Sequence, residues 1–226
     1  MDGHVAKIPD GMSFEDAATL GVGTTSVGQS LYMTLKLPLP TGPAKTPFPI
    51  LIYGGSSATG SLAIQYAKLS GLTVVTTASP KNFDLVKSRG ADAVFDYHDP
   101  ECGQKIREYT NNSLQYVLDP ICTEASFKIC AEALPSAEDA KGELKLVALL
   151  PLDKWPRTDV NATVLLCYTT FGEAFSKYGQ DFPAIKECWE YGEMFWKLTN
   201  TLLKAGKIKN HPVLLRPNGF QGVSAG

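Results

Sequence analysis

The sequence has no hydrophobic run long enough to cross a membrane and little excess charge of either sign. No stretch reaches the roughly 18 consecutive apolar residues of a membrane span. The first residues, MDGHVAKIPDG, lack the apolar core of a signal peptide. Over 226 residues the formal net charge is −2, so nothing favours binding to a nucleic acid or an anionic membrane. We therefore expect a cytoplasmic protein that binds neither.

Closely spaced cysteine pairs are also absent. The three histidines lie far apart in the sequence, and none is spaced with a cysteine or carboxylate as a metal ligand set would be. The cysteines are odd in number and form no CxxC pair, standing at Cys102, Cys122, Cys130, Cys167 and Cys188. We expect reduced, mostly buried thiols and no bound metal ion.

The N-terminal part combines helical and proline-rich segments. Ser13 followed by Asp16 resembles a helix N-cap, and the break Gly21-Val22-Gly23 divides the helical stretch that follows. Five prolines between Pro38 and Pro49 exclude regular structure and indicate a surface connection. At 226 residues the chain can hold one large domain, or one domain and part of another.

Five short apolar strands alternating with amphipathic helices follow this connection. Such alternation implies right-handed crossovers and a parallel sheet with both faces covered. We therefore predict an α/β, doubly wound parallel sheet, the Rossmann fold, over residues 46–175. The predicted strands are Ile50 to Tyr53, Thr73 to Ala78, Ala93 to Tyr97, Gln115 to Asp119 and Leu144 to Leu150.

The remaining segments flank this domain. Residues 1–45 form a leading segment, and residues 176–226 form a third one with a long helix from Phe182 to Gly206 and an extended HPVLLR. A further helical segment is expected near residues 163–170. Within the long helix, Met194, Phe195 and Trp196 are interpreted as core residues rather than cofactor contacts.

The segment LIYGGSSATG predicts a phosphate-binding turn. A strand runs into Gly54 and Gly55, and small residues lead to Gly60 at the start of a helix. Small residues let the backbone approach a diphosphate, and the N–H groups and dipole of the helix N-terminus stabilise its charge. The literal GxGxxG pattern is missing, but the turn follows the first of several strand–helix units.

The end of the second predicted strand indicates which dinucleotide is bound. NAD-binding domains usually carry an Asp or Glu about 20 residues beyond the glycines, which bonds the ribose hydroxyls. Here the segment reads TTASPKN, with Ser79, Lys81 and Asn82 and no acid before Asp84. A hydroxyl, an ammonium and an amide suit the 2′-phosphate of NADPH.

Several segments resemble the medium-chain dehydrogenase/reductases, and among them the zinc-free fungal enoyl reductases that act in trans on polyketide synthases. The similar segments are AKIPDGMSFEDAATL, YGGSSATGSLAIQ, SPKNFDLVKSRGADAVFDY, TTFGE and residues 206–216. The resemblance implies an NADPH-dependent enzyme of polyketide secondary metabolism. It would reduce the carbon–carbon double bond of an α,β-unsaturated thioester, with a polyketide synthase as partner.

The resemblance also implies roles for individual residues. The pyrophosphate would lie against Ser56, Ser57, Ala58 and Thr59, and the 2′-phosphate against Ser79, Lys81 and Asn82. Tyr97 would border the adenine, and Leu149 and Leu150 the nicotinamide. The acyl substrate would face Thr24, Thr25 and Ser26, expected before a helix N-terminus, and Leu166, Cys167, Tyr168, Thr169 and Thr170. Hydroxyls of Thr24 to Ser26 are candidate oxyanion donors, and no catalytic proton donor is assigned.

The chain departs from this family at both ends. Its relatives carry an N-terminal GroES-like catalytic domain of about a hundred residues, and a last helix and strand after the equivalent of Gly226. We therefore expect a cofactor-binding fragment with remnants of the catalytic domain, inactive by itself. Two alternatives remain, a zinc-free quinone or alkenal reductase and a non-catalytic dinucleotide-binding module. A methyltransferase is disfavoured because no acid ends the second strand.

Overall fold

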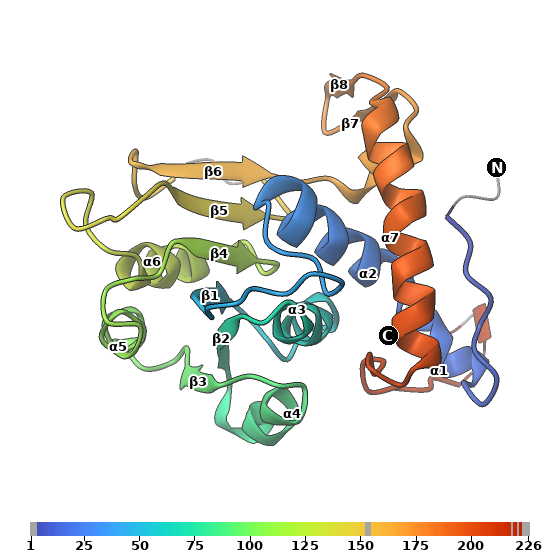
Figure 1. The fold of residues 1–226 in the computed structure, drawn as a ribbon, viewed down its shortest axis with the longest axis horizontal. Helices are drawn as coiled ribbons and strands as arrows, with labels where there is room; N and C mark the ends of the chain where they lie inside the picture. The colour runs from blue at the N-terminus through green and yellow to red at the C-terminus, as the bar shows by residue number, and fades with distance from the viewer. Residues whose placement is uncertain (1–3, 152–154, 218, 221, 223–226) are drawn as a thin grey trace.

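A six-stranded parallel sheet forms the centre of the molecule (Figure 1). The computed structural model describes residues 4–151, 155–217, 219–220 and 222. The strand order is β3-β2-β1-β4-β5-β6, so the direction of winding reverses between β1 and β4. This order confirms the predicted doubly wound fold. The strands are β1 Pro49–Ile52, β2 Thr73–Ala78, β3 Ala93–Asp96, β4 Tyr116–Asp119, β5 Leu144–Ala148 and β6 Val160–Val164.

Helices cover both faces of the sheet, as Figure 1 shows. Ile50 and Ile52 of β1 belong to the hydrophobic cluster on the side of α3 and α4, whereas Leu51 belongs to the cluster on the side of α5 and α6. Because both faces are buried, the strand reads as a continuous apolar run. The helices are α1 Phe14–Ala18, α2 Gly21–Gly28, α3 Ala58–Leu69, α4 Phe83–Ser88, α5 Cys102–Tyr109, α6 Glu124–Ala133 and α7 Lys186–Lys204.

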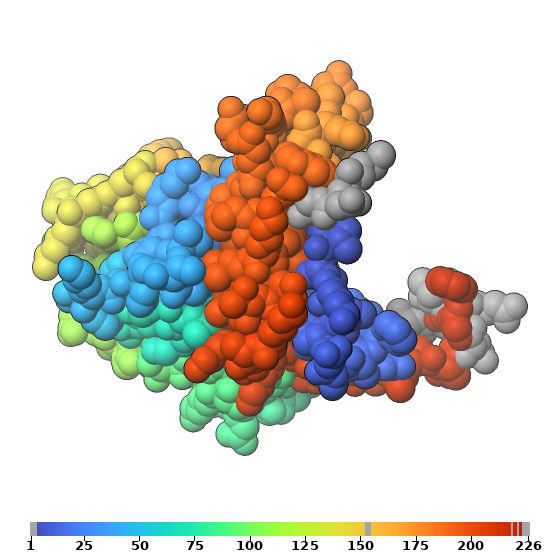
Figure 2. All heavy atoms as spheres, turned by 45° about the vertical axis from the view of Figure 1, so that its right-hand side comes forward, coloured from blue at the N-terminus to red at the C-terminus, as the bar shows by residue number. Residues whose placement is uncertain are grey.

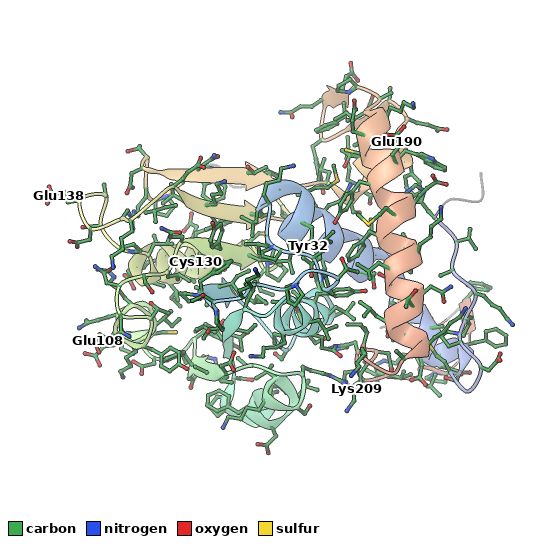
Figure 3. The ribbon with its side chains drawn as sticks, viewed as in Figure 1. Tyr32, Glu108, Cys130, Glu138, Glu190 and Lys209 are labelled. Carbon is green, nitrogen blue, oxygen red and sulfur yellow. The ribbon has the colours of Figure 1, made fainter. Side chains whose placement is uncertain are left out.

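The two cores can be located in Figure 3 by their labelled side chains. Tyr32, in a π-helical segment at Gln29–Thr34, belongs to the cluster on the side of α3 and α4. Cys130, in α6, belongs to the cluster on the side of α5 and α6. Labelled carboxylates such as Glu108 and Glu190 lie at the periphery instead. All five cysteines are free, and three of them are buried.

The first two helices meet at a different point from the one predicted. Ser13 caps α1 as expected, because its Oγ accepts a hydrogen bond from the N–H of Asp16 at 3.0 Å. The interruption, however, falls at residues 19–20, and Gly21 and Gly23 are already part of α2. The glycines therefore begin the second helix instead of separating the two.

The prediction of five strands was incomplete, and the helical segment expected near residues 163–170 is present only in its second half, as a 3-10 helix. β6 pairs in parallel with β5 along its whole length, and a 3-10 turn at Cys167–Phe171 follows it. Three of the five β6 residues are exposed, so the strand lacks an apolar pattern. Phe175–Lys177 (β7) and Gln180–Phe182 (β8) form an antiparallel hairpin, so the long helix begins after Phe182, at Lys186.

Helix α7 packs across the α3 side of the molecule. In Figure 2 it runs in orange over the middle of the face, with the dark-blue N-terminal segment beside it. Contacts of α2 with both α3 and α7 join the flanking segments to the sheet domain, and the predicted three-segment division stays a prediction. Among the described residues, no helix combines the length and hydropathy needed to span a membrane.

Residues 209–211, after α7, have no regular structure and contact α3. The side-chain amide of Gln65 bonds the backbone of Lys209 twice, donating to its carbonyl at 2.9 Å and accepting from its N–H at 2.7 Å. Next to it, His211 Nδ1 and Ser61 Oγ are 3.0 Å apart, and Arg89 donates to the Asn210 carbonyl at 2.8 Å. The C-terminal segment is therefore attached to the helix that follows β1.

Replacing Phe195 with alanine should strongly destabilise the fold. Its side chain is 1% exposed, and its ring lies 5.2 Å from that of Tyr66 and 5.6 Å from that of Tyr32. We expect Phe195→Ala to lower the free energy of unfolding by about 3–5 kcal/mol in urea titrations. Met194, which the sequence also placed in the core, is instead 38% exposed, so Met194→Ala should cost less than about 1 kcal/mol. Equal losses would contradict the assignment of Phe195 to the core.

Candidate functional site

A tight turn joins β1 to α3 at the carboxyl edge of the sheet. Gly54 has φ +64°, a conformation that favours glycine. Its N–H donates to Thr77 Oγ1 at 2.9 Å, and the N–H of Gly55 donates to the Thr77 carbonyl at 2.9 Å. A Cβ on Gly60 would clash with the Gly54 carbonyl and lie 2.9 Å from the Cα of Gly55. The glycines thus bring the start of α3 into contact with the strand end.

The N-terminus of α3 has the features of an anion site. Ser57 is the N-cap, and its Oγ accepts from the N–H of Gly60 at 3.0 Å. The N–H groups of Ala58 and Thr59, at the first two positions, have no carbonyl partner within the helix. Ala58 is exposed, and Ser56, Ser57 and Thr59 are half-buried. These donors and the positive end of a 12-residue helix suit a diphosphate.

The three residues predicted at the 2′-phosphate lie together at the end of β2. A 3-10 turn at Pro80–Asn82 follows the strand. It brings the side-chain amide of Asn82 to the hydroxyl of Ser79, at 3.2 Å. Lys81 is exposed, and among the described residues no carboxylate pairs with its ammonium group. The group is therefore available to a bound anion.

Tyr97 follows β3 beside the same strand ends. Its ring centroid lies 6.3 Å from that of Tyr53 and 4.2 Å from that of His98, and its side chain is 37% exposed. The nearby acid is engaged locally, because Asp96 Oδ1 accepts from the backbone N–H of His98 at 3.0 Å and contacts its Nδ1 at 2.7 Å. The backbone hydrogen bond from His98 lowers the pKa of Asp96.

Leu149 and Leu150 follow β5, on the other side of the point where the strand order reverses. Leu149 is half-buried and Leu150 is 46% exposed. Their backbone N–H groups donate to the Sγ atom of Cys122, at 3.2 and 3.3 Å.

Burial raises the pKa of Asp119, the last residue of β4. The sequence interpretation missed Asp119 and Cys122, although an acid at a strand end is a recognisable signal.

The structure changes the interpretation of Thr24 to Ser26. These residues lie inside α2 and not before a helix N-terminus, and Thr24 and Ser26 are buried. Thr25 Oγ1 donates to the Gly21 carbonyl at 3.3 Å and accepts from the indole N–H of Trp196 at 3.2 Å. Their hydroxyls are therefore largely enclosed, although α2 itself lies next to the phosphate turn.

The second segment predicted to face the substrate meets the helical segment that follows α2. The side-chain amide of Gln29 donates to Thr169 Oγ1 at 2.9 Å, which joins the two parts. Leu166 and Thr170 are buried, and Cys167 and Thr169 are half-buried. Tyr168 is 42% exposed, and its hydroxyl accepts from Lys177 Nζ at 3.2 Å. Whether any of these residues contacts a substrate stays a prediction.

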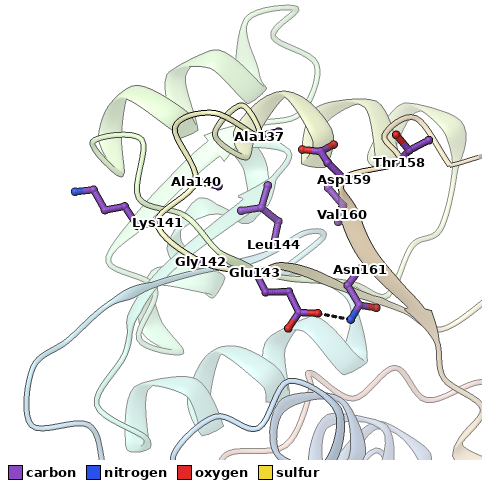
Figure 4. A pocket seen from close by; sticks show the side chains of 10 residues that line it. All are labelled: Ala137, Ala140, Lys141, Gly142, Glu143, Leu144, Thr158, Asp159, Val160 and Asn161. Atoms are coloured by element: carbon purple, nitrogen blue, oxygen red, sulfur yellow. Dashed lines mark hydrogen bonds between the residues drawn. The ribbon is translucent and has the colours of Figure 1, made fainter.

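A separate hollow of about 590 Å³ lies where β5 and β6 begin, at the edge opposite the phosphate turn (Figure 4). Glu143 lines it and accepts a hydrogen bond from the side-chain amide of Asn161 at 2.6 Å. None of the predicted cofactor residues belongs to its lining.

Within residues 4–151, 155–217, 219–220 and 222, no three His, Cys, Asp or Glu side chains gather as metal ligands.

The chain is similar to known proteins in sequence and in fold. The model of a family described as zinc-binding dehydrogenases matches residues 58–205. The described side chains do not fit a zinc ion. The solved structure of the CurK enoyl reductase superposes with a TM-score of 0.70 over 93% of this chain and 57% of that protein. Its sequence identity is only 18%, so this likeness shows the fold alone.

Two fungal relatives are more similar in sequence. The dual trans-enoyl reductase/FAD-dependent monooxygenase tazHJ of Aspergillus terreus is 53% identical, and the trans-enoyl reductase ACTTS2 of Alternaria alternata is 51% identical. Each alignment covers 98% of this chain. It covers 31% of the first relative and 62% of the second, so the chain spans less than two thirds of their lengths.

Gly60→Ala should open the phosphate turn. The added Cβ meets backbone atoms of Gly54 and Gly55, which cannot move aside like a flexible side chain. We expect a stability loss of about 1–3 kcal/mol in urea titrations, and at least about tenfold weaker dinucleotide binding by calorimetry. Gly42→Ala is the control, because no atom lies within 4 Å of a Cβ at that position. Unchanged affinity in Gly60→Ala would argue against a ligand at this turn.

Proposed function

The chain belongs to the zinc-binding dehydrogenase family of the medium-chain dehydrogenase/reductases, in the group of fungal trans-enoyl reductases, and we propose that it is the NADPH-binding part of such a reductase. The reaction we propose is reduction of the carbon–carbon double bond of an α,β-unsaturated thioester. The substrate would be an acyl chain carried by a polyketide synthase. The relatives are named trans-enoyl reductases, which supports the proposed reaction. The ammonium group of Lys81 at the end of β2 supports NADPH as the cofactor.

The observation that carries the cofactor assignment is the pairing of two anion sites along one sheet edge. The turn after β1 presents the N–H groups of Ala58 and Thr59, and the turn after β2 presents Lys81 beside Ser79 and Asn82. β1 and β2 are neighbours in register, with Ile52 opposite Thr76. A diphosphate held by the first turn would direct its adenosine toward β2, where Lys81 would hold a 2′-phosphate.

The residues of this chain bind and orient the cofactor in the proposed reaction. NADPH, when bound, supplies the hydride that reduces the double bond. Ala58 and Thr59 hold the diphosphate, Lys81 holds the 2′-phosphate, and Tyr97 offers an aromatic face to the adenine. The strand ends after β4 and β5 then support the nicotinamide half. The described residues do not fit a zinc site, so no step is assigned to zinc.

Charge that develops on the thioester oxygen needs hydrogen-bond donors. Thr24 and Ser26 are buried, and the Thr25 hydroxyl bonds the backbone of its own helix, so the α2 hydroxyls are poor candidates. Of the hydroxyl-bearing residues expected to face the substrate, Tyr168 is the one whose side chain is exposed. Its hydroxyl is also the one that accepts from a lysine, Lys177.

Lys81→Ala tests the cofactor preference. Loss of a charge-assisted bond to the 2′-phosphate should weaken NADPH binding by about 1–3 kcal/mol, and NADH binding should hardly change. Calorimetry with both dinucleotides measures the difference. Lys87→Ala is the matched control, because it removes the same charge from an exposed position on α4. Equal weakening of NADPH and NADH in Lys81→Ala would remove the basis for preferring NADPH.

The reaction is tested by NADPH oxidation with a panel of electron acceptors. A protein of the relatives' length that contains this chain should turn over a crotonyl thioester and leave quinones unreacted. The 226-residue chain alone should bind NADPH without turnover. Turnover of quinones only would support the quinone reductase alternative. If the longer protein reduces neither class, the chain is better described as a dinucleotide-binding module.

A further inference from the structure

The loop that follows β4 is held by a buried carboxylate. Asp119 is fully buried at the end of the strand, and its Oδ1 accepts from the N–H groups of Ile121 at 2.8 Å and Cys122 at 3.1 Å. Its Oδ2 accepts from the hydroxyl of Ser126 in the first turn of α6. The carboxylate therefore fixes residues 119–122, which we call the 119–122 loop, against the start of α6.

Cys122 connects this loop to the next strand. Its Sγ accepts from the N–H groups of Leu149 and Leu150, at 3.2 and 3.3 Å, and its S–H donates to the Asp119 carbonyl at 3.0 Å. The residue has φ +60°, which side chains with a Cβ rarely adopt. Such a conformation persists only where the surroundings hold it. The thiol thus bridges the carboxyl ends of β4 and β5.

The bridge lies in the half of the sheet away from the 2′-phosphate residues. In a sheet of this order, each set of three strands binds one half of a dinucleotide, and the two halves meet where the order reverses. β2 carries Lys81 at its end, so the adenosine half belongs to β1, β2 and β3. The ends of β4 and β5 then lie under the nicotinamide half.

The loop also contacts the phosphate turn. A Cβ on Gly54 would lie 2.8 Å from the Cδ1 atom of Ile121, so the isoleucine side chain occupies the space above that glycine. The ends of three adjacent strands, β1, β4 and β5, are therefore held together by the 119–122 loop.

We propose that the 119–122 loop is a positioning device for the nicotinamide half of the cofactor, and that the Cys122 thiol acts by holding the backbone of Leu149 and Leu150. The inference rests on the proposed binding of NADPH. Cys122 need not touch the cofactor, because its two accepted hydrogen bonds fix the strand end that does.

The thiol is suited to this role because it stays protonated. Burial raises the pKa of Cys122 to about 11. At neutral pH the sulfur can therefore donate one hydrogen bond and accept two. A serine hydroxyl keeps the same donor and acceptor functions on a shorter bond. Glycine removes both functions and tolerates the positive φ without strain.

Two variants of the full 226-residue chain test the proposal with two ligands. Cys122→Gly removes the bridge, and Cys122→Ser keeps a bridging oxygen. Affinities are measured for NADPH and for 2′,5′-ADP, which has the adenosine half and no nicotinamide. We expect Cys122→Gly to weaken NADPH by about tenfold and 2′,5′-ADP by less than about twofold, and Cys122→Ser to restore most of the NADPH affinity.

The fluorescence of bound NADPH gives a second readout, because it reports the surroundings of the reduced nicotinamide. Its enhancement should fall in Cys122→Gly and return in Cys122→Ser. Equal weakening of both ligands would mean that Cys122 only supports the fold, and unchanged NADPH binding would mean that the bridge positions nothing. Either result overturns the proposal. A wild-type chain that binds neither ligand would instead refute the proposed function, and this inference with it.

Discussion

The arrangement of the candidate site depends on the packing of Gly60 against the carbonyl of Gly54, which leaves no room for a Cβ. Without a side chain at residue 60, the first turn of α3 reaches the end of β1, and Ser57 can cap the helix from within the turn. The hydrogen bonds from Gly54 and Gly55 to Thr77 then fix this turn relative to β2. The two candidate anion sites are consequently connected through hydrogen bonds to Thr77 of β2.

Much of the fold could be predicted because the strands of the inner sheet are buried on both faces. Ile50, Leu51 and Ile52 read as one apolar run, and Thr73 to Ala78 is recognisable by its β-branched residues. β6 escaped prediction because it lies at the sheet edge with mostly exposed residues. The hairpin of β7 and β8 was missed although Tyr178 and Gly179 form a turn with two positive φ angles, a pattern typical of short hairpins.

The parts of the candidate site that consecutive residues form could be predicted, whereas contacts between residues far apart in the sequence could not. The turn at Ser56 to Thr59 and the group of Ser79, Lys81 and Asn82 each lie within a few consecutive residues, so their chemistry is legible in the sequence. The contact of Cys122 with Leu149 spans 27 positions, and the contact of Thr25 with Trp196 spans 171. No local sequence pattern predicts contacts over such distances along the chain. The contact of Cys122 with Leu149 was therefore overlooked, and the Thr25 hydroxyl was expected to be free.

Helix α3 begins at the predicted phosphate turn and also binds residues 209–211, near the C-terminus. Gln65 makes two hydrogen bonds to the backbone of Lys209, and Ser61 contacts His211 one helical turn nearer the N-terminus of the same helix. A ligand that shifts α3 must carry residues 209–211 with it or strain those bonds. If a ligand at the N-terminus of α3 changed the strength of those bonds, tightening residues 209–211 against α3 would change the affinity for that ligand by the same factor. Any such linkage would pass through the hydrogen bonds of both Ser61 and Gln65.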